Sequence, residues 1–280
     1  MNRVRATVRS RAGAAALLAL AISLPSACSA GGPPSIVGKQ SLRIGVKADQ
    51  PGLGLRLPDG RFVGFDVDVA RYVAAKLGVR PDHITFVPVT SATRETALEN
   101  GSVDMVFATY SITPERETKV TFGGPYYVAH QDTMVRRGET AIRNVHDLKG
   151  KRLCAVAGSD SWKRVTQELN IAATLVPATS YSQCVTMLLD HRVDAVSTDD
   201  LILAGFAARL GSAVRILNAP FSYERYGIGI KKGDLAACEA VNRAVSQMYL
   251  DGTAAALLHK WFGKTGLQLD THVPQFEGCG

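Results

Sequence analysis

The order of predicted strands and helices in this chain occurs twice. Apolar runs and helical spacing of apolar residues predict a strand–helix–strand–helix–strand unit at 42–46, 66–77, 84–89, 93–99 and 103–108. The same unit returns at 152–157, 161–169, 173–176, 182–190 and 193–197. Strands that alternate with helices are typical of largely parallel sheets with helices on their faces. The chain is therefore expected to form two similar α/β lobes.

A short sequence phrase also occurs in both units. Val103-Asp104-Met105-Val106 and Val193-Asp194-Ala195-Val196 share the pattern Val-Asp-x-Val, and each follows a predicted helix. Ligands of open parallel sheets bind at the carboxyl ends of the strands. The segments that follow Val106 and Val196 are therefore where we expect a ligand.

The end of the chain is expected to return to the first lobe. A further strand is predicted at 227–230, and helices follow at 235–248 and 254–261, with Trp261 and Phe262 packing on the first lobe. The resulting division is a first lobe at 39–128, a hinge and second lobe at 129–223, and a return segment at 224–280. Two crossings between lobes predict a hinge and a central cleft.

Residues 1–27 have the composition of an export signal. The cationic start contains Arg3, Arg5, Arg9 and Arg11, and the apolar run at 12–24 is short for a transmembrane helix. Ala27 ends this segment, and the junction between Ala27 and Cys28 resembles a bacterial lipoprotein cleavage site. Cys28 would then carry a lipid on the extracytoplasmic face of the cell membrane, with 28–38 as a tether. The alternative is ordinary secretory cleavage near Ala27 or Ala30.

The charge of the chain gives little support for nucleic-acid binding. Loss of the four leader arginines would lower the formal net charge from +7 to +3, and the rest of the chain has no long basic run.

Four cysteines remain after Cys28, and an even number in an exported protein suggests two disulfides. We favour Cys154–Cys184 and Cys238–Cys279, because each pair would lie within one lobe. The alternative is buried free thiols. The wide spacing of these cysteines argues against a zinc site, and we expect no metal.

Three stretches carry further motifs: Ser111–Arg116 (Ser-Ile-Thr-x-x-Arg), Gly64–Asp68 (Gly-Phe-Asp-x-Asp) and Val193–Asp199. Together these motifs resemble those of the family 3 solute-binding proteins of polar amino-acid ABC transporters. The segment 49–54 is also similar to glutamate-binding lipoproteins of actinobacteria. The resemblance covers about residues 40–265. It implies a two-lobed, periplasmic-binding-protein-like fold of type II, without a cofactor, that acts as a monomer and delivers a free amino acid to an ABC permease.

The resemblance also implies roles for residues in the cleft. Arg116 would bind the ligand carboxylate, with a hydroxyl from Ser111, and Asp199 would bind the ammonium, with Thr198 beside it. Alternatively, Arg116 makes a surface ion pair with Glu115 or Glu117, and Asp199 is a loop acid or a helix N-cap.

The side-chain pocket is less defined by the motifs. Gly158 and Ser159 match a turn that the family uses at a helix start, where backbone N–H groups favour an anion. Asp160 departs from the usual small residue, and either favours a cationic or amide ligand or caps the helix. The remaining candidates are Lys163, Lys47 and Tyr110. Lys163 could equally lie on a solvated helix face, and Lys47 could make no ligand contact. Tyr110 could equally be part of the core packing. We expect glutamate or aspartate ahead of their amides.

Two other functions use the same architecture. An exported dehydratase would need an acid or base near the cleft, but the histidines lie outside the two cleft segments, so we expect no enzyme. A sensor that reports amino-acid levels to a membrane partner would use the same closed state as a transporter component, and the sequence does not separate these two roles.

Overall fold

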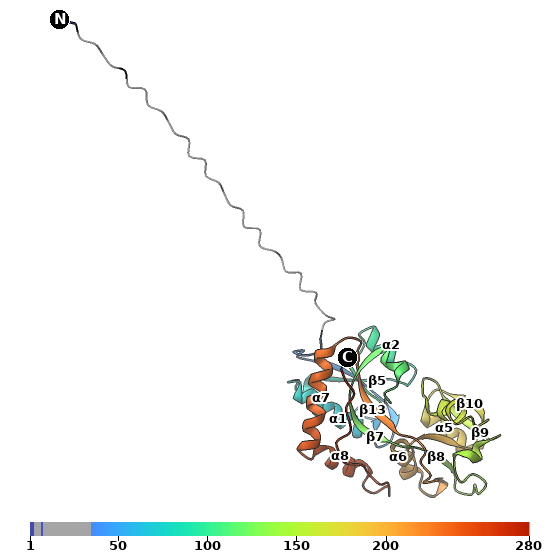
Figure 1. Ribbon diagram of the computed structural model, residues 1–280. Helices are drawn as coiled ribbons and strands as arrows, with labels where there is room; N and C mark the ends of the chain where they lie inside the picture. The colour runs from blue at the N-terminus through green and yellow to red at the C-terminus, as the bar shows by residue number, and fades with distance from the viewer. Residues whose placement is uncertain (3–6, 8–34, 280) are drawn as a thin grey trace. The chain divides into compact units, whose positions relative to one another are not determined.

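A computed structural model describes residues 35–279, together with residues 1, 2 and 7 (Figure 1). Cys28 and most of the predicted export signal and tether lie outside these residues. No helix of the described part is long and apolar enough to span a membrane.

The first lobe contains a five-stranded sheet in the order β5-β1-β6-β13-β7. The strands are β1 (Leu42–Val46), β5 (Ile84–Pro88), β6 (Met105–Phe107), β7 (Val120–Ala129) and β13 (Glu224–Lys231). β1 is parallel to β5 and β6, whereas β13 is antiparallel to both β6 and β7. The strand from the end of the chain thus completes the sheet that the beginning of the chain starts.

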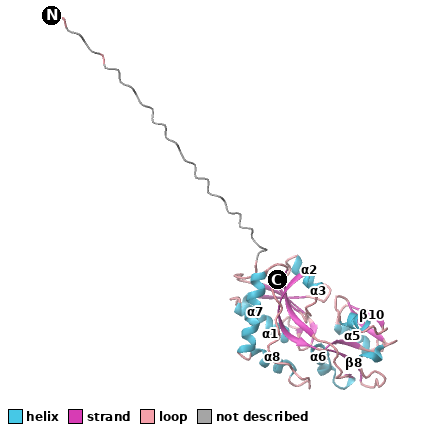
Figure 2. Ribbon diagram, viewed as in Figure 1, coloured by secondary structure: helices cyan, strands magenta, loops and turns pink. Residues whose placement is uncertain are grey.

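Helices cover both faces of this sheet (Figure 2). They are α1 (Phe65–Lys76), α2 (Arg94–Glu99), α7 (Leu235–Leu250) and α8 (Thr253–Phe262). Alternate residues of a strand point to opposite faces. Met105 and Phe107 accordingly pack with α1, α7 and α8, while Val106 packs with Leu98 of α2. A small antiparallel sheet of β2 (Asp49–Gln50), β3 (Gly54–Arg56) and β4 (Phe62–Val63) lies before α1 in the chain.

The second lobe contains two small sheets. β9 (Arg152–Val156) is parallel to β10 (Thr174–Ala178), and β8 (Gln131–Arg136) lies between β11 (Val196–Asp199) and β12 (Val214–Ile216). The longer helices are α5 (Tyr181–Leu189) and α6 (Asp200–Leu210). The short helical segments of the chain are α3 (Pro114–Glu117), α4 (Ser161–Lys163), the π-helical η3 (Arg164–Glu168), and the 3₁₀ segments η1 (Pro81–His83), η2 (Val145–Leu148) and η4 (Gly211–Ala213).

The prediction of a largely parallel sheet holds in the second lobe only for the predicted strands. β9 is parallel to β10, and Leu153 of β9 forms a parallel bridge to Ala195, just before β11. β8, which follows β7 of the first lobe, is antiparallel to both β11 and β12. The patterns do not predict β7, β8 or α6. β7 is buried along almost its whole length, so it shows no alternation of polar and apolar residues.

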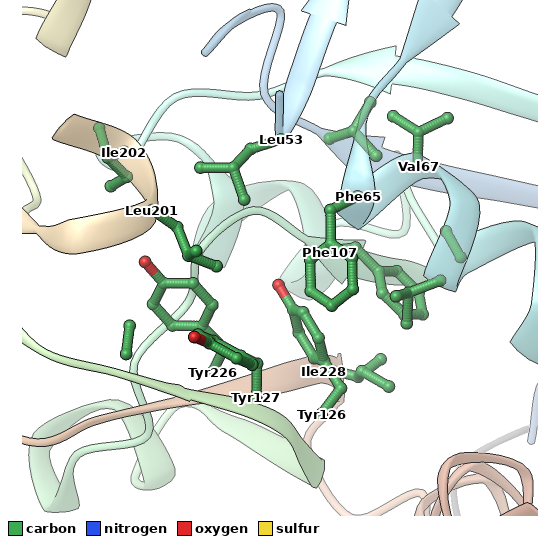
Figure 3. Close-up of a cluster of buried hydrophobic side chains, with 14 of the residues drawn as sticks. Leu53, Phe65, Val67, Phe107, Tyr126, Tyr127, Leu201, Ile202, Tyr226 and Ile228 are labelled. Atoms are coloured by element: carbon green, nitrogen blue, oxygen red, sulfur yellow. The ribbon is translucent and has the colours of Figure 1, made fainter. Parts of the chain in front are cut away.

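The main hydrophobic core runs from the first lobe to α6 (Figure 3). Leu201 and Ile202 of α6 belong to the same cluster as Leu53, Tyr127 and Tyr226. α6 is apolar on several sides because it contacts β8 in the second lobe and α8 in the first. This helix begins directly after Asp199 and therefore fixes that carboxylate relative to both lobes.

The C-terminal residues pack on the first lobe as predicted. Phe262 is buried, and its ring lies under Gly52, while Trp261 Nε1 donates a hydrogen bond to Asp68 Oδ2 over 2.9 Å. Burial of an aromatic side chain of this size contributes about 1.5–3 kcal/mol.

Two disulfides join Cys154 to Cys184 and Cys238 to Cys279. They are the two pairings favoured from the sequence. The first links β9 to α5 in the second lobe, and the second links α7 to the end of the chain.

Candidate ligand-binding site

A small polar cavity lies between the two lobes. Five lining residues come from the first lobe: Ser91, Arg94, Thr109, Ser111 and Arg116. The others come from the second lobe and the start of β13: Ser159, Asp160, Ser161, Tyr181, Thr198, Asp199, Ile202 and Glu224. The lining is almost entirely polar, and it contains both the Arg116 and the Asp199 that the sequence motifs single out.

Arg116 is held in the cavity by the turn that follows β6. Pro114 begins α3, and the Thr113 side chain accepts a hydrogen bond from the Arg116 backbone N–H, so the helix start is capped. The guanidinium is 5% exposed, donates to the Ser111 carbonyl over 2.8 Å and to the Gly158 carbonyl over 3.2 Å, and pairs with Asp160 at 2.8 Å. Arg116 therefore contacts both lobes.

Asp199 ends β11 and occupies the N-cap position of α6. Its side chain makes no capping hydrogen bond, but accepts one from the Tyr226 hydroxyl over 2.7 Å. Asp199 is 4% exposed, and burial, followed by the negative charge of Glu224, raises the pKa of its carboxyl well above the usual value. A buried carboxyl group in this position can pair with a cation that enters the cavity.

Hydroxyl groups connect the second-lobe side of the cavity. The Ser159 and Tyr181 hydroxyls are 2.6 Å apart, Tyr181 donates to Ser161 Oγ over 2.9 Å, and Ser161 Oγ lies 3.2 Å from Thr198 Oγ1. Tyr181 was not predicted, because a tyrosine in the first turn of α5 is indistinguishable in sequence from an ordinary helix start.

Gly158 marks a close approach between the lobes. It adopts φ +74°, and a Cβ at this position would lie 2.5 Å from the Ser91 carbonyl group. Glycine is required here both by its backbone conformation and by the neighbouring backbone.

We expect Gly158→Ala to weaken ligand binding by about 100-fold. The alanine would hold a strained backbone conformation, and its Cβ would keep the second lobe from reaching Ser91. Titration calorimetry of the variant checks this. Gly150→Ala is the matched control, since Gly150 has φ +73° but open space around its Cβ position. If the two variants bind equally, contact between the lobes at Gly158 is not needed for binding.

The remaining predicted residues do not line the cavity. Lys163 forms ion pairs with Glu115 at 3.3 Å and Asp160 at 3.1 Å, so it joins the lobes at their surface. The Tyr110 ring is core packing, with the Phe122 ring centroid 4.7 Å away. Asp160, in contrast, does line the cavity, and it makes no capping hydrogen bond because its carboxylate is engaged by Arg116 and Lys163.

Lys47 lies behind the cavity wall. Its ammonium donates to Ser91 Oγ over 2.7 Å, and burial, followed by the positive charge of Arg94, lowers the Lys47 pKa to about 7. A carboxylate placed close to it would raise this pKa again.

Arg94 is a lining residue that the sequence analysis missed. It is buried on the same face of α2 as Leu98, four residues later, and this spacing was the available signal. No group of three or more potential metal ligands is present in the described residues.

The chain matches a known protein family over most of its length. The model of the bacterial extracellular solute-binding proteins, family 3, matches residues 42–264. The chain belongs to this family. The family 3 match includes every residue that lines the cavity between the lobes.

This solute-binding protein is similar to two glutamate-binding proteins named GluB. The protein from Corynebacterium glutamicum is 38% identical over 94% of this chain and 92% of its own length. The protein from Corynebacterium efficiens is 40% identical over 98% and 97%. A solved structure described as an ancestral arginine-binding protein bound to arginine has a TM-score of 0.74 and 34% identity, over 80% of this chain and 99% of that one. The names of these similar proteins thus cover ligands of opposite side-chain charge.

Proposed function

We propose that this protein binds an α-amino acid with an acidic side chain, or its amide, and delivers it to an ABC permease. We further propose that it is exported and held on the outer face of the cell membrane by a lipid on Cys28. The observation that carries the ligand class is the pair of buried, opposite charges, Arg116 and Asp199, in one small cavity between two lobes.

The chemistry of a free amino acid fits this pair. The planar Arg116 guanidinium can bind the α-carboxylate through two parallel hydrogen bonds, with the Ser111 hydroxyl beside it. Asp199 can pair with the α-ammonium, which would stabilise its ionised form. Because the two residues lie in different lobes, the ligand would hold the lobes together, and closure would present one composite surface to the permease.

The assignment as a binding protein, not an enzyme, is supported by the chemistry of the cavity. Its lining contains no histidine or cysteine. Its carboxyl groups have partners in the protein: Asp160 pairs with Arg116, Glu224 with Arg164, and Asp199 with the Tyr226 hydroxyl. The names of the two corynebacterial relatives support glutamate as the ligand.

A thermal-shift screen of the purified protein against the twenty amino acids tests the proposed function. A ligand present at a hundred times its dissociation constant is expected to raise the free energy of unfolding by about 2.7 kcal/mol. We expect this rise with glutamate or aspartate, and a smaller one with the amides. The absence of a shift with every amino acid would contradict the proposal.

A further inference from the structure

Arg116 pairs with a carboxylate of the opposite lobe inside the cavity. Its Nη2 lies 2.8 Å from Asp160 Oδ2, and the two side chains expose only 6% and 19% of their surface. Arg116 lies in α3 of the first lobe, and Asp160 precedes α4 of the second. Both residues line the cavity. An ion pair that is largely shielded from water is screened less than a surface pair, so this contact favours closed lobes.

Asp160 occupies the part of Arg116 that a free amino acid would need. Arg116 Nη1 donates to the Ser111 carbonyl, and Nη2 donates to the Gly158 carbonyl. A guanidinium binds a carboxylate through two parallel hydrogen bonds, either from Nη1 and Nη2 or from Nε and Nη2. Both arrangements use Nη2, which already lies against Asp160. Two carboxylates at one site also repel each other. An α-carboxylate that binds Arg116 must therefore displace the Asp160 side chain.

Lys163 gives the displaced carboxylate another partner. Its Nζ lies 3.1 Å from Asp160 Oδ1, and the two residues are three positions apart in the same lobe. Asp160 occupies the N-cap position of α4 without a capping hydrogen bond, so its side chain can turn away from Arg116 without breaking a bond to the helix. The ion pair with Lys163 lies within one lobe and can persist when the lobes separate, whereas the pair with Arg116 cannot.

We propose that Asp160 is an internal competitor of the ligand. Its carboxylate pairs with Arg116 when the cavity is free, and it pairs with Lys163 alone when an amino acid binds. This inference rests on the proposed function, and it concerns the strength of binding, not the choice of side chain. A protein that must first give up an internal contact has a lower apparent affinity for its ligand. Because every α-amino acid carries the same α-carboxylate, the affinity should be lowered by one common factor for all of them.

Titration calorimetry with L-glutamate and L-glutamine tests the proposal on the unaltered protein and on Asp160→Ala. We expect the variant to bind both amino acids about 10-fold more tightly, because the ligand no longer displaces a charged partner of Arg116. Glu115→Gln is the matched control. It removes the surface ion pair between Glu115 and Lys163, which also joins the lobes, at 3.3 Å, but it leaves Asp160 on Arg116. This control should not bind either amino acid more tightly.

Small-angle X-ray scattering of the ligand-free proteins gives an independent measurement. Since the Asp160–Arg116 pair joins the lobes, we expect the free Asp160→Ala protein to have a larger radius of gyration than the free unaltered protein. Saturating glutamate should bring both proteins to the same smaller value. Equal radii of the two free proteins would contradict the proposal that Asp160 holds the lobes together before the ligand arrives.

The outcomes separate the proposal from the proposed function. If neither the unaltered protein nor Asp160→Ala binds any amino acid, the proposed function fails. If Asp160→Ala binds amino acids as tightly as the unaltered protein or more weakly, Asp160 supports the cavity or contacts the ligand, and only its role as a competitor is wrong. Should Asp160→Ala not fold by circular dichroism, Asp160→Asn replaces it. The asparagine has no charge but keeps an acceptor, so we expect a gain of only about 3-fold, and an unchanged or lower affinity contradicts the proposal.

Discussion

Arg116→Ala is expected to reduce the affinity for the amino acid by roughly 100- to 4,000-fold. Removing one partner of a buried ion pair costs about 3–5 kcal/mol, because the other charge stays enclosed without a counter-charge. Here that charge is the ligand α-carboxylate. The Arg116 side chain is also bonded to Ser111 and Gly158, so its loss removes a contact between the two lobes.

Titration calorimetry and circular dichroism of the same sample check this prediction. Arg116→Lys retains the charge without the planar fork, and we expect it to recover only part of the affinity. Arg137→Ala, on the exposed surface of the second lobe, is the matched control and should bind normally. Normal binding by a folded Arg116→Ala variant would mean that the carboxylate lies elsewhere.

Asp199→Asn is expected to abolish measurable binding of glutamate while raising the stability of the free protein. The pKa of Asp199 is raised by burial and by Glu224, so ionisation of this carboxyl destabilises the folded state once the pH exceeds the unfolded pKa near 3.9. The destabilisation grows until the pH reaches the folded pKa. Asparagine avoids it and can still accept the hydrogen bond from Tyr226.

Thermal unfolding of the free protein between pH 4 and pH 8 measures the change in stability, and titration calorimetry measures the loss of glutamate binding. Glutarate is a useful control ligand, because it has both carboxylates of glutamate but no ammonium. Its weak binding should not fall in Asp199→Asn. A variant that binds glutamate normally, or that loses glutarate and glutamate equally, would overturn the role of Asp199 as the ammonium partner.

Local sequence patterns predicted the elements whose apolar spacing is regular. The stripe from Val69 to Leu77 placed α1 to within a residue at each end, and the two Val-Asp-x-Val phrases located the strands that lead into the cavity. The patterns fail for β7, which is buried on both faces, and for α6, which packs on both lobes. Their sequences reflect burial, and burial alone does not separate a strand from a helix.

The candidate site also contains residues that the sequence predicts and residues that it does not. Arg116, Ser111 and Asp199 lie in motifs with fixed spacing, and the structure brings them to one cavity. Arg94 and Tyr181 were not predicted, because their positions depend on tertiary contacts. Arg94 is buried by the Tyr110 ring and the Ala108 carbonyl, which follow it by more than ten residues, and Tyr181 reaches the cavity through Ser159 and Ser161. Lys163 was a reasonable candidate by position, but Glu115 of the other lobe binds it at the surface.

A crystal structure of the protein with L-glutamate tests the central claim most directly. We predict a single glutamate between the lobes, with its α-carboxylate on Arg116 and its ammonium on Asp199. A ligand bound outside this cavity, or one whose ammonium and α-carboxylate contact neither Asp199 nor Arg116, would contradict the account.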